Sequence, residues 1–366
     1  MRKHIAGAAI VAVGMLLAGC GGSPTASNSG QSGGGAAEEV YAKINGLSGE
    51  ERSKTLLDMA REENNLSLYT SNTDMADVVS AFEAKYGIKV DTYRANSETV
   101  LQRMLQEAGS NYQGADIVEF NAGGLNALNQ EGLLAAYDSD LRDAVRPEGQ
   151  KENWTADGFN AFVVGWNTQR VPVNAQPTSL EQLAAPEWRG RISLEVGDID
   201  WFAAMYKYYQ SEGKSDDEIM DLFNRLAGNA KIAKGHTVMG ELLSAGQFDV
   251  AASVYSHTVD NGAAEGAPVA WLHPDGKPVE PVVLRPNGAG LLKTARHPAT
   301  AMLFMDFLLT DGQKQIADAN RIGSVPTADD PLEGVQIVTP PEEELLNDSQ
   351  KWNDLYAQIV QGGQQT

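Results

Sequence analysis

The sequence predicts an α/β protein of two lobes, each built on a mixed, mostly parallel sheet flanked by helices. Residues 65–90 have the pattern of a strand, a polar turn, a helix and a second strand. The alternation continues to a third strand at 115–120, and right-handed crossovers make a parallel sheet the expected result. About 330 residues follow the N-terminal leader and the glycine-rich segment after it, which is more than one hydrophobic core usually holds. Two lobes are therefore expected.

The first strand and helix define the first candidate site. Residues 66–69 form an apolar run suited to a buried strand, and apolar residues recur at helical spacing over 75–86 before Gly87, which fits a left-handed helix end. The polar turn between them lies at the carboxyl edge of the sheet, where open α/β sheets bind ligands. The candidate contacts are Thr70, Ser71 and Asn72. These residues can equally serve only to cap the helix.

Later strands and helices provide the other candidates. Helices are expected at 50–64, after Ser97, and at 202–209, 215–227, 237–245 and 299–309, with further strands at 159–166, 248–255 and 281–292. Polar or aromatic side chains at element ends are Arg94, Ser97, Glu119, Asn121, Asp198, Asp200, Trp201, Tyr255 and His257. For Trp201 a core position is the alternative, and for the two aspartates a solvated turn. The region after Pro340 is expected to be helical and to pack on the second lobe.

The N-terminus predicts export. A charged start is followed by an apolar run at 5–17, which is too short to span a bilayer as a mature helix, so residues 1–20 are expected to be a signal peptide. The LAGC segment that ends at Cys20 resembles the lipobox of bacterial lipoproteins, which implies that Cys20 is lipidated. The glycine-rich and serine-rich residues that follow predict a flexible tether over 21–49. We therefore expect an extracytoplasmic protein that touches the membrane only through its lipid anchor.

Composition excludes several partners. The formal net charge of −21 argues against nucleic acid and anionic lipid, which both require basic surfaces. Cys20 is the only cysteine, so no intrachain disulfide can form. The HExxH motif of common metallohydrolases is absent from the sequence.

Three segments carry a resemblance to a known family. They are LSLYTSNTDMADVVSAFEAKYGIKV, SLEQLAAPEWRGRISLEV and HPATAMLFMDFLLTDGQKQIADANRIGSVPT. Together they resemble the extracellular solute-binding proteins of ABC importers, in particular the ferric-iron-binding group, over residues 50–327. The resemblance implies a type II periplasmic-binding-protein fold, with strand order 2-1-3-n-4 in each lobe and a ligand cleft at the hinge. The lobes are expected at 50–152 with 258–312, and at 153–257 with 313–366.

This resemblance also implies a function. The protein would close its hinge around a small solute or metal ion and present the closed form to a permease, with the ATPase on another chain. It would act as a monomer without catalysis. A secreted hydrolase and a ligand-sensing receptor with the same fold are the alternatives.

The ligand is open at this stage. The ferric-binding group has two adjacent tyrosines where this chain has Tyr255, Ser256 and His257, so an iron site would consist of Tyr255, His257 and Glu119. Iron would then be cargo, and no other cofactor is expected. A small polar organic solute is the alternative. An anionic head would suit Ser71, Ser97 and Arg94, whereas a cationic one would suit Glu119, Asp198, Asp200 and Trp201.

Overall fold

The computed structural model describes residues 34–110, 112 and 114–363. The predicted signal peptide, Cys20 and residues 21–33 of the predicted tether lie outside this part of the chain. No helix within the described residues is long and apolar enough to cross a membrane.

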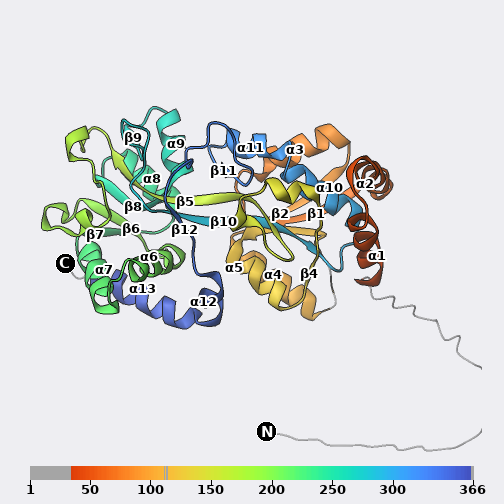
Figure 1. Cartoon of the computed structure of the whole chain (residues 1–366), viewed down its shortest axis with the longest axis horizontal. Coiled ribbons are helices and arrows are strands. Elements are labelled where there is room, and N and C mark those ends of the chain that lie inside the picture. Colours follow the sequence, from red (N-terminus) through yellow and green to blue (C-terminus); the bar gives the residue numbers. More distant parts are fainter. Residues whose placement is uncertain (1–33, 111, 113, 364–366) are drawn as a thin grey trace, which may run out of the picture. The chain divides into compact units, whose positions relative to one another are not determined.

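A single sheet runs through both lobes in the order β2-β1-β3-β10-β5-β8-β6-β7 (Figure 1). The strands are β1 (Asn65–Thr70), β2 (Lys89–Arg94), β3 (Ile117–Asn121), β5 (Thr155–Asn167), β6 (Ile192–Glu195), β7 (Ala230–Ala233), β8 (Val250–Tyr255) and β10 (Val282–Leu292). Read from one end the order is β2-β1-β3-β10-β5, and from the other end it is β7-β6-β8-β5-β10. Each reading is 2-1-3-n-4, so the predicted strand order is confirmed in both lobes.

Strands β5 and β10 are long, antiparallel and shared by the two lobes. Their register shifts between Asn287 and Gly288, as in a β-bulge. A Cβ on Gly288 would lie 2.5 Å from the Thr155 carbonyl oxygen, so the close approach of the strands requires glycine here. Because these strands carry the chain between the lobes, we assign the hinge to them.

The first lobe surrounds β1, β2 and β3. Its helices are α1 (Gly34–Asn45), α2 (Gly49–Glu63), α3 (Met75–Tyr86), α4 (Ser97–Gly109), α5 (Ala122–Gln130), α10 (Pro298–Leu308) and α11 (Gly312–Asp318). Short strand β4 (Leu134–Ala135) pairs with β10. Helix α2, the β1–α3–β2 unit and the left-handed Gly87 match the sequence prediction.

The prediction of a flexible tether over 21–49 is wrong for residues 34–45. Residues 34–45 form α1, and Ala37, Tyr41 and Ile44 on one face of it are buried in the core of the first lobe. The Tyr41 hydroxyl donates a hydrogen bond to the Leu292 carbonyl at 2.9 Å. These apolar residues at helical spacing explain why the glycine-rich composition does not extend the tether further.

The second lobe surrounds β6, β7 and β8. Its helices are α6 (Ile199–Ser211), α7 (Asp216–Gly228), α8 (His236–Ser244), α9 (Ser256–Ala264) and α13 (Ser349–Gly363). Short strand β9 (Val269–Ala270) pairs with β5. Helix α13 packs against α6 and α7, as expected of the C-terminal region.

Two segments pack differently from the predicted lobe boundaries. Helix α9, which the sequence places mostly in the first lobe, packs against β5, β8 and α8 of the second. Helix α11, assigned to the second lobe, packs against α3 and α10 of the first, with Ile316 buried in that core. The return crossing is therefore made by β10, where the long apolar strand gives no local signal of a lobe boundary.

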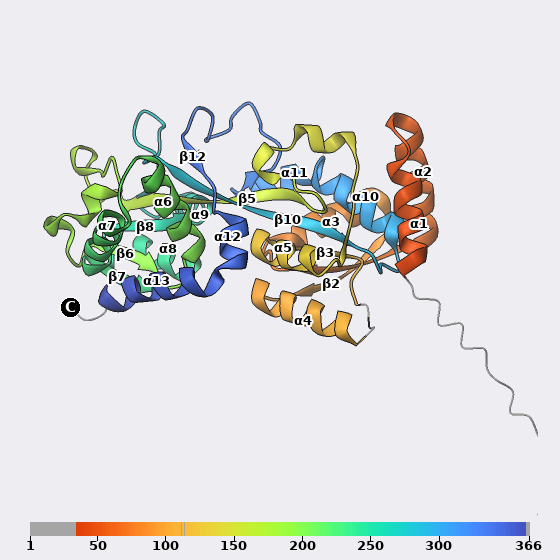
Figure 2. The same ribbon diagram turned by 60° about the horizontal axis from the view of Figure 1, so that its bottom comes forward.

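The last crossing uses short strands and a small helix. Strand β11 (Ile322–Gly323) pairs with β5, β12 (Ile337–Val338) pairs with β10, and α12 (Glu342–Asn347) follows. Helix α12 contacts α5 of the first lobe and α13 of the second (Figure 2).

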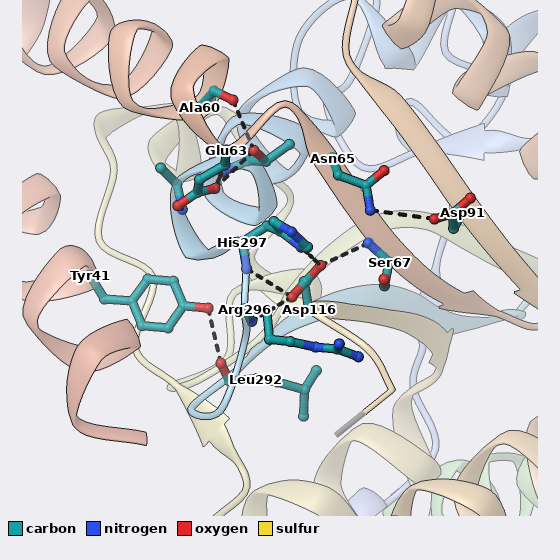
Figure 3. Close-up of polar contacts among 12 residues, drawn as sticks. Tyr41, Ala60, Glu63, Asn65, Ser67, Asp91, Asp116, Leu292, Arg296 and His297 are labelled. Atoms are coloured by element: carbon teal, nitrogen blue, oxygen red, sulfur yellow. Dashed lines mark hydrogen bonds and ion pairs between the residues drawn. The ribbon is translucent and has the colours of Figure 1, made fainter. Parts of the chain in front are cut away.

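Asp116, just before β3, organises the amino edge of the first lobe (Figure 3). Its carboxylate accepts hydrogen bonds from the backbone N–H groups of Ser67 at 2.8 Å, Arg296 at 2.7 Å and His297 at 3.0 Å. The His297 Nδ1 lies 2.8 Å from Asp116 Oδ2. This buried carboxylate therefore ties the loop before α10 to β1.

Candidate functional site

The turn after β1 lies against the carboxyl end of β3. Thr70 is fully buried and its hydroxyl donates to Glu119 Oε2, while the Asn72 N–H donates to Thr70 Oγ1 at 3.0 Å. The Ser71 N–H donates to the Glu119 carbonyl at 3.0 Å. The N-cap position of α3 is Asp74, so Thr70, Ser71 and Asn72 support Glu119 and the turn rather than capping the helix directly.

Glu119 and Asp157 form a buried acidic pair at the hinge. Their exposed fractions are 0% and 2%, and within the described chain Glu119 Oε1 and Asp157 Oδ2 have no hydrogen-bond partner. Burial raises the pKa of Glu119, and burial together with the nearby charge of Glu119 raises the pKa of Asp157 well above its ordinary value. Both carboxyls line a small cavity of about 10 Å³ with Asn72 and Asn160, which is room for roughly one water.

Arg321 lines the same cavity and was not among the predicted residues. It donates to Asp74 Oδ2 at 2.6 Å, Thr73 Oγ1 at 3.2 Å and Asn160 Oδ1 at 3.4 Å. It comes from the loop between α11 and β11, so only tertiary structure brings it to the turn after β1. Its guanidinium gives the acidic pair a nearby positive charge.

Arg285, on β10, is the second residue that sequence reasoning missed. Its guanidinium donates to Asp200 Oδ2 at 3.1 Å and to the Tyr255 hydroxyl at 2.8 Å, and its Nε has no partner within the described chain. The available signal was a single arginine inside a mostly apolar strand. A charge in such a strand needs partners, and here Asp200 and Tyr255 of the second lobe provide them.

Aromatic rings stack around Tyr255. The His236 ring lies over it with a centroid distance of 3.6 Å, and Phe162 meets its edge at 4.9 Å. Burial, together with Asp198 and Asp200, raises the pKa of the Tyr255 hydroxyl, although Arg285 acts in the opposite direction. The phenol is therefore neutral at neutral pH in this arrangement.

His257 stacks near Tyr255 and is influenced by the charges of both arginines. Its ring centroid is 5.4 Å from that of Tyr255, and 9% of the residue is exposed. Burial, together with the positive charges of Arg321 and Arg285 and with His236, lowers the pKa of His257 to about 3. It is therefore a neutral imidazole at neutral pH, able to donate one hydrogen bond and accept one.

A larger cavity, of about 270 Å³, lies between the lobes and has Arg285 and Asp200 in its wall. Its first-lobe wall includes Leu101 on α4 and the first residues of α5, and its second-lobe wall includes Ile199 and the helices α12 and α13. Helices α5 and α6 begin at this wall, and the positive end of a helix dipole favours negatively charged or hydrogen-bond-accepting groups. The cavity is close to the size of a small organic ligand.

Some predicted residues lie outside these clusters. Trp201 is 3% exposed in the core of the second lobe, with its ring 5.6 Å from that of Phe223, because its position in the first turn of α6 faces α7. Arg94 is exposed at the end of edge strand β2. The cap of α4 is Asn96, which accepts from the Thr99 N–H at 2.9 Å, and Ser97 is the first helical residue.

Asn121 also acts as a helix cap. Its side chain accepts a hydrogen bond from the Gly124 N–H at 2.9 Å at the start of α5. Gly124 is required there, since a Cβ would lie 2.1 Å from the Phe120 ring.

The residues suggested for an iron site do not gather into a cluster of acids and imidazoles. In the described part of the chain, the group of three or more such side chains that could hold a metal ion is Glu195, Asp198 and His236. Neither Glu119 nor His257 belongs to it.

Comparisons with known proteins agree with this architecture. The chain is 22% identical, over 250 residues, to the Fe(3+)-binding periplasmic protein of Serratia marcescens, covering 66% of this chain and 72% of that protein. The structure resembles iron-bound HitA from Pseudomonas aeruginosa with a TM-score of 0.68 at 20% identity, over 81% of this chain and 99% of that one. It also resembles the periplasmic binding protein AfuA from Actinobacillus pleuropneumoniae with fructose-6-phosphate bound, with a TM-score of 0.65 at 22% identity, over 81% and 98% of the two chains.

A family assignment follows from the sequence comparison. Residues 113–344, more than half of the chain, match the family described as bacterial extracellular solute-binding protein. The two-lobe fold is that of the periplasmic binding proteins to which the structure is similar. This protein is a member of the bacterial extracellular solute-binding protein family.

Proposed function

We propose that this protein is the solute-capturing subunit of an ABC importer and that its cargo is a small polar organic solute. The observation that carries the proposal is the inter-lobe cavity of about 270 Å³ with Arg285 and Asp200 in its wall. A solute there contacts both lobes, so it stabilises the closed form through differential binding, and the permease then recognises that form.

The chemistry of the wall supports an organic solute. Arg285 and the first turns of α5 and α6 provide hydrogen-bond donors for an anionic or oxygen-rich head. Leu101 and Ile199 provide apolar surface for a carbon skeleton. AfuA, a structural relative, binds a sugar phosphate, which combines both features.

Ferric iron is the second candidate. It is favoured by the curated relative from Serratia marcescens, whose name states that it binds Fe(3+), and by the iron-bound state of HitA. In this chain, however, the one phenol at the expected place, Tyr255, already bonds the Arg285 guanidinium at 2.8 Å. A positive charge so near disfavours a trivalent cation on the same oxygen, and Ser256 replaces the second phenol.

A thermal-shift screen of the purified protein tests the proposal. The panel contains fructose-6-phosphate, aminoethylphosphonate, spermidine and ferric citrate. A ligand at 100 times its dissociation constant should add about 2.7 kcal/mol of stability, or roughly 5 °C or more at this size. Arg285→Ala should abolish an organic-ligand shift, whereas Arg94→Ala, at an exposed arginine outside the cavity, should retain it.

The opposite pattern would replace the proposal. A shift with iron alone that survives Arg285→Ala and disappears in Tyr255→Phe would make iron the cargo. No shift with any organic member of the panel would exclude the sugar phosphate, phosphonate and polyamine classes.

The anchor and the partners extend the same proposal. Cys20 is proposed to carry lipid, which holds a monomeric binding protein at the membrane surface beside its permease and ATPase. Cell fractionation checks this: the wild-type chain should stay with membranes, and Cys20→Ser should move to the soluble fraction. The members of the family are solute-binding proteins rather than enzymes.

A further inference from the structure

A second cluster of ionisable side chains lies wholly within the second lobe. Glu195 is the last residue of β6, Asp198 precedes α6, and His236 is the first residue of α8. One possible ligand atom from each lies within 4.8 Å of the others. None of the three belongs to the cavity wall described above.

The cluster is buried and acidic. Glu195 and Asp198 are 7% and 3% exposed, and the His236 side chain is 13% exposed. Two carboxylates removed from water in this way favour a cation between them.

The surrounding backbone fixes Glu195 in place. Its carboxylate accepts hydrogen bonds from the Gly197 N–H and from the Gly235 N–H, the latter at 2.8 Å. Tyr356 on α13 donates to its backbone carbonyl at 2.6 Å. Such hydrogen bonds orient the carboxylate and leave a lone pair free on each oxygen. Metal-binding carboxylates are commonly oriented by hydrogen bonds of this kind.

Two buried atoms of the cluster have no partner within the described residues. They are Asp198 Oδ2, on a side chain more than nine-tenths buried, and His236 Nδ1. The remaining nitrogen and oxygen of these two side chains, His236 Nε2 and Asp198 Oδ1, lie 2.9 Å apart. Neighbouring ligand atoms around one tetrahedral metal lie about 3.3 Å apart for bonds of about 2.0 Å, so little movement would admit an ion.

We propose that Glu195, Asp198 and His236 bind a divalent first-row transition-metal cation, with Zn²⁺ and Mn²⁺ as the matching chemistry. Two carboxylate oxygens and one imidazole nitrogen suit these ions, and water completes the coordination. The cation neutralises the buried carboxylates, fixes the turn that carries Asp200 into the wall of the solute cavity, and fixes the His236 ring that stacks on Tyr255. Because all three ligands come from one lobe, the metal binds without hinge closure.

Metal content and affinity test this site on the purified full chain, with no solute present. The protein is stripped with chelator, dialysed against ZnCl₂ or MnCl₂, and measured by inductively coupled plasma mass spectrometry and titration calorimetry. We expect one equivalent of bound metal. His236→Ala and the nearly isosteric Asp198→Asn should weaken binding at least 10-fold, whereas His273→Ala should leave it unchanged.

His273 is a matched control because it is a histidine of the same region, held by Gln176 at 3.0 Å and by the Trp166 ring. Urea unfolding of each variant shows whether it is folded. Should Asp198→Asn fail to fold, Glu195→Gln takes its place. Less than one equivalent in wild type, or full binding in both His236→Ala and the folded carboxamide variant, would overturn the site.

This test is independent of the cargo. Arg285→Ala should lose solute binding but keep the metal, and the metal variants are scored without solute. The experiments therefore distinguish failure of the metal site from failure of the proposed solute-binding function.

Discussion

Two buried carboxylates three residues apart, Asp116 just before β3 and Glu119 within it, have different surroundings. Asp116, at the amino end, is 1% exposed, and three backbone N–H groups and His297 surround its two oxygens (Figure 3). Glu119, toward the carboxyl end, is fully buried, yet its Oε1 has no partner within the described chain. Both side chains are buried carboxylates, and they differ in how many hydrogen-bond donors surround them.

The comparison distinguishes structural from functional acids. Asp116 joins β1 to the loop before α10, and Glu63 nearby accepts from the N–H groups of Ala299 and Thr300 at the start of α10. Glu119 sits at the carboxyl edge, where it meets Asp157 and the cavity at the hinge. A buried acid with all its partners stabilises the fold, whereas one without them lowers stability and is retained where a ligand binds.

The largest effect is expected at Asp116. Asp116→Ala leaves several buried N–H groups without an acceptor, so the free energy of unfolding should fall by roughly 3–5 kcal/mol. Urea unfolding followed by circular dichroism measures it. Asp91→Ala, at the exposed neighbour that bonds Asn65 at 3.4 Å, should change stability by no more than about 0.5 kcal/mol. A loss below about 1 kcal/mol at Asp116 would remove the structural side of the comparison.

A smaller effect of opposite sign is expected at Glu119. Glu119→Gln keeps the shape and removes a buried charge, so the solute-free protein should gain about 1–2 kcal/mol at neutral pH. Chemical unfolding measures this gain. A destabilised variant would show that Glu119 is structural like Asp116.

The pH dependence of stability tests independently whether the charge of Glu119 is destabilising. The folded-state pKa of Glu119 is raised, so the cost of its charge is present at high pH and is relieved as pH falls through that pKa toward the unfolded value of about 4.3. Gln does not titrate. The stability advantage of Glu119→Gln should therefore narrow as pH is lowered from 8 to about 5; an advantage that widened would contradict the buried-charge explanation.

The smallest effect on stability is expected at Glu342, a partly exposed acid on α12. This helix contacts both lobes. It bonds Asn126 at 2.9 Å and Lys151 at 3.2 Å in the first lobe, while Glu344 bonds Lys207 of the second at 2.7 Å. Glu342→Gln should change unfolding free energy by less than about 1 kcal/mol. It should nevertheless increase the open population in solute-free protein.

Single-molecule energy transfer between dyes on the two lobes measures this population. Glu343→Gln, at the exposed neighbouring acid, is the matched control. Equal distance distributions in the two variants would show that α12 does not restrain the lobes.

Much of the first lobe could be predicted from local sequence. The apolar run at 66–69, the helical spacing over 75–86 and the left-handed Gly87 are local signals, and each element forms where they indicate. The cap of α4 was assigned one residue late, because Asn96 and Ser97 have equivalent capping chemistry and only the backbone angles distinguish them. Trp201 could not be placed, since a first-turn residue can face a cleft or a core.

The hinge could be predicted only in part. Glu119, Asp200, Tyr255 and His257 were found because they end strands or start helices, which places them at the carboxyl edge. Arg285 and Arg321 were missed because one lies within an apolar strand and the other in a loop far along the chain. Their roles depend on partners 85 and 247 residues away, Asp200 and Asp74.

By itself the sequence determined the α/β class, the alternation of elements and the acids at strand ends, because these depend on periodicity and on the conformational preferences of neighbouring residues. Tertiary structure alone decided which carboxylates find donors, where the arginines lie and which lobe holds α9 and α11. Those outcomes depend on contacts between distant segments. No local pattern encodes that the Asp116 carboxylate meets three backbone N–H groups while Glu119 Oε1 has no partner within the described chain.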